Sequence, residues 1–146
     1  MLRPMVVEHR GPFDREVLAD EQCRSRLELA ALARVLISVR CMPAALPVFI
    51  HVMSHHVLIA SDEDAVIDAA RRGDVLAVQV DGTDDHGVTW SVQATGVAHL
   101  PTTGDVLTLA GESSRLSPAL ERGATLIAIP LTIVSGESVR WTFPGI

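Results

Sequence analysis

Three of the six histidines lie close together, at His51, His55 and His56, and imidazole nitrogens are common zinc ligands. His51 and His56 would approach each other if they stood on opposite arms of a hairpin. His55 and His56 are adjacent, however, so in an extended chain their side chains point to opposite sides. No cysteine or carboxylate lies at ligand spacing beside them. The pattern therefore favours surface histidines in a turn over a metal site.

A second group of polar residues lies at Asp81, Asp84, Asp85 and His86, shortly before Ser91. A hydrolase needs a nucleophile, an aligned base and an oxyanion hole. Ser91 is a nucleophile by residue type only, because no Gly-x-Ser-x-Gly elbow surrounds it. The group is typical of a polar loop, so we assign no catalytic acid, base or nucleophile.

The residue types that are missing limit the chemistry further. The chain has no lysine, tyrosine or asparagine, and all twelve basic residues are arginines. This excludes a Schiff-base lysine, a tyrosine acid and a P-loop lysine. The net charge of −6 and the lack of a basic run argue against nucleic acid as a partner. Cys23 and Cys41 form no metal pattern and are typical of small buried or reduced side chains.

The length and hydropathy of the chain indicate one ordinary domain. The 146 residues are 48% hydrophobic, which is enough for a substantial core. No apolar run reaches the roughly 18 residues of a membrane helix, and charge interrupts the N-terminal residues too early for a signal peptide. We expect a soluble, cytoplasmic protein with no membrane partner, folded as a single domain over 1–146 with an irregular N-terminal arm over 1–14.

The elements that must position these side chains are mostly strands. The segment Val75–Leu100 is rich in valine and threonine and breaks at Gly82–Gly87, which predicts two antiparallel strands and a loop. Helices are predicted at 20–31, with Asp20 as N-cap, and at 63–72, ended by Gly73. Apolar or alternating runs predict further strands at 35–40, 45–52, 57–60, 124–134 and 138–143.

This order predicts a mainly β protein: an antiparallel barrel of six to seven strands with short helices at its ends. Four short motifs then carry a resemblance: Leu32-Ala-Arg-Val35, Pro43-Ala-Ala-Leu-Pro-Val48, Trp90-Ser-Val92 and Thr95-Gly96. In their order and gaps, the chain resembles the pyridoxamine 5′-phosphate oxidase-like, FMN-binding split-barrel family, in the small form common in actinobacteria. The resemblance covers residues 15–140.

The resemblance implies a homodimeric split β-barrel that binds FMN or a related deazaflavin between subunits and acts as an oxidoreductase on a small molecule. The flavin carries the hydride transfer, so the protein has to bind and orient it. Trp90 would either stack on the flavin or fill the barrel or the dimer seam. The resemblance places the cofactor-binding positions at Pro47, Val48, Phe49, Ile59, Ala60, Ser61, Trp90 and Ser91.

The chain departs from the family where the flavin phosphate binds. The family ends its third strand with Arg-Thr and has a lysine shortly afterwards, whereas this chain has Ala60, Ser61 and Val66. Each lost charged contact is worth about 1.5–3 kcal/mol. Three alternatives stay open: FMN binds weakly, binds through other arginines such as Arg34, Arg40 or Arg71, or does not bind. In the last case the chain is a non-catalytic dimer that acts as a small-ligand binding or structural protein.

Overall fold

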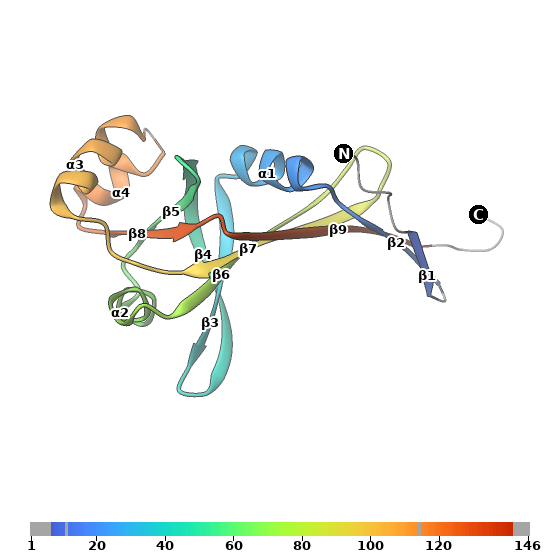
Figure 1. Cartoon of the computed structure of the whole chain (residues 1–146), viewed down its shortest axis with the longest axis horizontal. Coiled ribbons are helices and arrows are strands. Elements are labelled where there is room, and N and C mark those ends of the chain that lie inside the picture. Colours follow the sequence, from blue (N-terminus) through green and yellow to red (C-terminus); the bar gives the residue numbers. More distant parts are fainter. Residues whose placement is uncertain (1–6, 11, 114, 142–146) are drawn as a thin grey trace.

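The computed structural model describes residues 7–10, 12–113 and 115–141, and within them nine strands form one antiparallel sheet. The strand order is β1-β2-β9-β7-β6-β3-β4-β5-β8 (Figure 1). The strands are β1 (Val7–Arg10), β2 (Phe13–Val17), β3 (Leu32–Val39), β4 (Met42–Met53), β5 (His56–Ser61), β6 (Val75–Thr83), β7 (Thr89–Val97), β8 (Thr125–Pro130) and β9 (Ile133–Trp141). The helices are α1 (Asp20–Leu29), α2 (Asp64–Arg72), α3 (Thr103–Glu112) and α4 (Ser117–Glu121).

The sheet closes into a barrel beyond the end of β7. His99 pairs with Ala128 of β8 in an antiparallel bridge, so β3, β4, β5, β8, β7 and β6 form a ring. The chain then leaves this ring between β8 and β9. The Leu131 N–H donates to the His55 carbonyl at 2.8 Å, in the turn before β5, and β8 does not continue past this point. β9 pairs with the earlier part of β7, which splits the barrel.

A glycine makes this seam possible. At Gly96, a Cβ atom would lie 2.6 Å from the carbonyl oxygen of Pro130, closer than atoms can pack. The Thr95-Gly96 motif therefore lies where β7 crosses the junction of β8 and β9. The predicted strand at 124–134 is wrong in this detail, since Pro130 ends β8 and β9 begins at Ile133.

The prediction of a mainly β, antiparallel split barrel is confirmed, with nine strands rather than six or seven. The predicted irregular arm over 1–14 is wrong for residues 7–10 and 13–14. These residues belong to β1 and β2, and β2 pairs with β9 from Phe13↔Trp141 to Val17↔Glu137. Residues 1–6 and 11 lie outside the described residues.

The two longer predicted helices occur with small shifts. Ala19, rather than Asp20, is the N-cap of α1, and its N–H donates to the Gln22 side chain at 2.9 Å. Asp20 and Glu21 instead occupy the first turn, where their negative charges interact favourably with the positive end of the helix dipole. α2 ends at Gly73, which adopts a left-handed φ of +73° as a C-cap.

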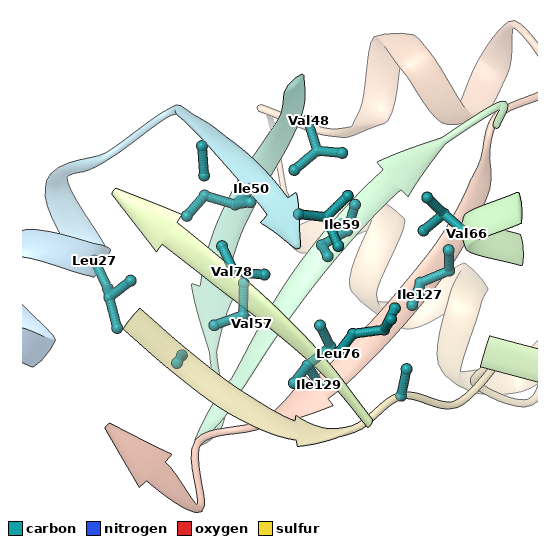
Figure 2. Close-up of a cluster of buried hydrophobic side chains, with 14 of the residues drawn as sticks. Leu27, Val48, Ile50, Val57, Ile59, Val66, Leu76, Val78, Ile127 and Ile129 are labelled. Atoms are coloured by element: carbon teal, nitrogen blue, oxygen red, sulfur yellow. The ribbon is translucent and has the colours of Figure 1, made fainter. Parts of the chain in front are cut away.

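The barrel interior is a single apolar core. Figure 2 shows Ile50, Val57, Ile59, Val78 and Ile127 converging from different strands, all at 0% exposure. A smaller cluster packs between β5, β8 and the segment that leads into α4. It consists of Leu58, Ala60, Leu116, Leu126 and Ala128.

α1 covers one face of the sheet beyond the barrel. Cys23 and Leu27 of α1 are fully buried against β7 and β9. A Cβ at Gly136 would lie 2.8 Å from the Cys23 sulfur, so the helix can approach the sheet closely. Burial also raises the pKa of the Cys23 thiol, which keeps it a neutral apolar group. Among the residues that the structure describes, no helix covers the opposite face of β7 and β9 (Figure 1).

Candidate functional site

We call this uncovered outer side of β3, β4, β6, β7 and β9 the open face. Directly opposed residues of antiparallel strands point to the same side. The register therefore aligns Arg34 with Gln79, Gln79 with Gln93, and Gln93 with Ser135. A row of polar side chains crosses four strands on this face.

Hydrogen bonds hold the polar row in place. Gln79 Nε2 donates to Ser91 Oγ at 3.0 Å, and Gln93 Nε2 donates to Thr95 Oγ1 at 3.2 Å. Each glutamine keeps its amide oxygen and a second N–H for other partners. The centre of the open face therefore offers both donors and acceptors to a planar polar group.

One cation stands beside these amides. The Arg34 guanidinium lies 3.5 Å from the Asp81 carboxylate, and their side chains are 62% and 42% exposed. An exposed pair at this distance is weakly held. Arg34 can therefore turn towards an anionic or carbonyl group of a ligand.

The open face is hollowed at two places. A shallow depression of about 340 Å³ lies between β2, β7 and β9 and includes Val17, Ser91, Gln93 and Ser135 in its lining. Another, of about 490 Å³, lies beside the β3–β4 hairpin and includes Leu36, Ala45 and Val75. Both depressions are open to solvent, so a ligand needs a second wall to be enclosed.

Apolar side chains surround the polar row. The described residues include nine exposed large hydrophobic side chains, and seven of them belong to the open face by register and alternation. One of the seven, Trp141, packs against Phe13 at the far end of β9, and six remain around the polar row. We call these six the apolar rim, and each is between 53% and 63% exposed. An apolar surface around a polar centre is typical of an interaction site. The apolar rim consists of Val17, Leu32, Phe49, Val75, Val97 and Ile133.

Three of the predicted cofactor-binding residues lie on the open face. Pro47 and Phe49 are exposed on β4, opposite Arg34 and Leu32. Ser91 lies on β7 and accepts the hydrogen bond from Gln79. The structure brings these residues to one side of the sheet, around Arg34.

Three others face away from it. Val48 and Ile59 are 4% and 0% exposed inside the barrel, so they shape the core rather than contact a ligand. Trp90 packs against Gly82, where a Cβ would overlap the indole. The guanidinium of Arg26 lies over the Trp90 ring, 4.4 Å from its centroid. Trp90 thus fixes α1 to the β6–β7 hairpin.

The remaining two, with Val66, lie where the resemblance predicts the phosphate contacts, and all three side chains are buried. Ala60 is 9% exposed under α4, and Val66 is 0% exposed in the barrel core. Ser61 is 6% exposed, and its hydroxyl oxygen accepts the Glu63 N–H at 3.1 Å. These residues do not fit a phosphate group.

Sequence reasoning missed Gln79 and Gln93 as members of the site. A signal was present, because Gln79 and Asp81 alternate with apolar residues on one strand, and Ser91, Gln93 and Thr95 do so on the next. Only the strand register shows that the polar side chains of these two strands lie side by side.

His51, one of the clustered histidines, helps to fasten the segment that covers Ala60. His51 Nδ1 lies 2.6 Å from Ser113 Oγ, and Ser113 is 1% exposed. Next to it, Arg115 Nη1 donates to the carbonyls of Glu28 and Ala30 at the end of α1. Burial lowers the pKa of His51, and the charge of Arg115 lowers it further. The lowered pKa favours the neutral form of His51, whose ring shares a hydrogen bond with the Ser113 hydroxyl.

We expect the protein to lose stability as the pH falls below about 6.5, the ordinary histidine pKa. The pKa of His51 is lower in the folded protein than in the unfolded chain, so as the pH falls the unfolded chain binds a proton at His51 before the folded protein does. The contribution of neutral His51 to the free energy of unfolding is therefore complete above pH 6.5 and is lost below it. Urea unfolding at pH 7.5 and 5.0 measures the change. His51→Gln should reduce the pH dependence, whereas the exposed control His86→Gln should not. Equal pH dependence in His51→Gln and the wild type would contradict this role.

The other histidines of the cluster do not join His51. His55 has a φ of +64° in the turn before β5, and His56 Nδ1 donates to the Ser54 carbonyl at 2.9 Å. Within residues 7–10, 12–113 and 115–141, no group of three or more His, Cys, Asp or Glu side chains is placed to hold a metal ion.

The antiparallel barrel, its seam at Gly96 and its uncovered face define a small split-barrel protein. The model of the family described as pyridoxamine 5′-phosphate oxidase matches residues 19–137. The chain belongs to this family. No curated protein matches the sequence.

Solved structures show the same fold at low sequence identity. An FAD-binding protein from Mesorhizobium loti is 20% identical, with a TM-score of 0.73 over 93% of this chain and 98% of its own. An FAD-binding protein from Mycobacterium smegmatis is 19% identical, with a TM-score of 0.61 over 86% and 99%. An FAD- and heme-binding protein from the same species is 15% identical, with a TM-score of 0.67 over 87% and 75%.

In the described part of the chain, no helix combines the length and the hydrophobicity needed to cross a bilayer.

Proposed function

We propose that the chain is a homodimeric flavin-binding oxidoreductase whose open face holds the flavin ring. The observation that carries this proposal is the polar row of Arg34, Gln79 and Gln93 inside the apolar rim. The family and the structural neighbours named as FAD-binding support the choice of a flavin over other planar ligands.

The chemistry of the ring fits the open face. A flavin presents carbonyl oxygens and ring nitrogens along one edge and an apolar dimethylbenzene at the other. Gln79 and Gln93 can donate to and accept from the polar edge, and Arg34 can donate to a carbonyl. Pro47 and Phe49 offer apolar surface beside them. A deazaflavin, which keeps the same polar edge, would bind in the same way.

When bound, the flavin supplies the hydride transfer. The residues of the chain bind the ring, orient it and exclude water. No acid or base is required from the protein for this role, which agrees with the lack of a catalytic constellation on the open face.

In this proposal, another copy of the chain provides the second wall of the site. The apolar rim is more than half exposed in a single chain, and a homodimer would cover it. The two depressions on the open face would then become closed clefts. Such an arrangement also explains why neither depression encloses a ligand alone.

A second candidate function is a non-catalytic dimer that has lost flavin binding. The observation that favours it is the burial of Ala60, Ser61 and Val66, which removes the phosphate contacts of the family. In this case the open face serves the dimer only, or binds another small ligand.

Titration of the purified protein with riboflavin, FMN and a deazaflavin distinguishes the two candidates. We expect quenching of flavin fluorescence at one flavin per chain and loss of this binding in Gln79→Leu/Gln93→Leu. Gln22→Leu, on the exposed surface of α1, is the control and should bind like the wild type. If no flavin binds while the protein remains folded and dimeric, the non-catalytic dimer is the correct function.

A further inference from the structure

We infer that the site selects flavins by the ring and discriminates against the phosphate, so that its preferred ligand is an uncharged flavin of the riboflavin type. This inference rests on the proposed function. It concerns the end of β5 and the start of α2, residues 60–66, which adjoin the open face where Ala60 pairs with Phe49. We call these residues the β5–α2 corner.

The β5–α2 corner has no cationic side chain for a phosphate. Ala60 and Val66 have no polar side-chain atoms, and the Ser61 hydroxyl, whose oxygen accepts the Glu63 N–H, keeps only one neutral O–H donor. A phosphate binds through several charge-assisted hydrogen bonds. None of these three side chains can replace the lost arginine and lysine.

An apolar layer also covers the corner. Ala60 packs with Leu58, Leu126 and Ala128 of the sheet and with Leu116 at the start of α4. Leu116 is 0% exposed, and the His51–Ser113 and Arg115 contacts fasten its segment to β4 and α1. A dianion placed here would lose its hydration without gaining a partner.

The charge around the corner is negative. Asp62, Glu63 and Asp64 are exposed, and no cation of the described residues pairs with them. The nearest arginines in sequence already have acidic partners, since Arg71 pairs with Asp68 at 3.1 Å and Arg72 with Asp74 at 2.8 Å. A phosphate of charge near −2 therefore meets repulsion at this end.

The salt dependence of binding follows from this charge. Where cations hold a phosphate, added salt weakens binding by screening the attraction. Here salt screens a repulsion, so it should tighten FMN binding and leave riboflavin unchanged. This sign is opposite to that of a conventional phosphate site.

The test is a fluorescence titration of the wild-type protein with riboflavin and FMN at 20 and 500 mM NaCl. We expect riboflavin to bind at least as tightly as FMN at low salt, and the two affinities to converge at high salt. Asp62→Asn/Asp64→Asn should raise the FMN affinity about fivefold at low salt, with riboflavin unaffected. The control Asp20→Asn/Glu21→Gln makes the same change in net charge on α1 and should alter neither affinity.

The outcomes separate the two proposals. FMN binding ten times tighter than riboflavin, or weakened by salt, would overturn the inference and leave the flavin proposal intact. If neither flavin binds, the proposed function fails and the inference fails with it. Equal gains of FMN affinity in both acid variants would also refute the inference, because the β5–α2 corner would then have no special part.

Discussion

The Val66→Lys variant will be less stable than the wild type by about 3–5 kcal/mol. Val66 is 0% exposed and joins α2 to the barrel core (Figure 2). An ammonium at this position would be buried without a carboxylate partner, which is among the most destabilising changes in a protein. Urea unfolding at pH 7.5 measures the loss.

The control for this variant is Asp62→Lys, which adds a lysine to the same segment at an exposed position. We expect it to change the free energy of unfolding by less than about 0.5 kcal/mol. If Val66→Lys were as stable as Asp62→Lys, α2 could not be docked on the core as described. The pair would also show that a lysine is not tolerated at residue 66, because the residues around Val66 are apolar.

The Gly96→Ala variant will be destabilised by about 2–3 kcal/mol. The added methyl group would lie 2.6 Å from the Pro130 carbonyl oxygen and 3.2 Å from an Ile129 side-chain carbon. The first of these is a backbone atom, so the β8–β9 junction itself has to move. Thermal or urea unfolding measures the loss.

Gly104→Ala is the matched control for the seam. Gly104 lies in α3, and a Cβ there would meet no atom within 4 Å. Alanine favours helix over glycine, so this variant should be as stable as the wild type or slightly more stable. Equal stability of Gly96→Ala and Gly104→Ala would contradict the close crossing of β7 and the β8–β9 junction.

Sequence patterns predicted the parts of the fold that depend on local order. The hairpin over Val75–Leu100 alternates polar and apolar residues and turns at glycine and aspartate, so its strands β6 and β7 were predicted closely. β1 and β2 were missed because β2 is held by β9, more than a hundred residues away. Their polar sequences carry no strand signal of their own.

The break between β8 and β9 was missed for a similar reason. Residues 124–134 are continuously apolar, and only the hydrogen bond of Leu131 to the β4–β5 turn shows where the strand ends. Pro130 lies inside this run and is the last residue of β8.

The candidate site was predictable only in part. The resemblance named Pro47, Phe49 and Ser91, which lie on one side of the sheet, but it also named Val48 and Ile59, which alternation turns into the core. The covering of Ala60 by α4 depends on a tertiary contact that no local pattern encodes. Gln79 and Gln93 emerged only from strand register.

The most direct test of the open face as the flavin site uses the side-chain amides themselves. The chain has no asparagine and only three glutamines, Gln22, Gln79 and Gln93, so an NMR amide spectrum contains three side-chain NH₂ pairs. On titration with riboflavin, we expect the pairs of Gln79 and Gln93 to shift and that of Gln22 to stay in place. Binding that leaves Gln79 and Gln93 unshifted would contradict the proposed site.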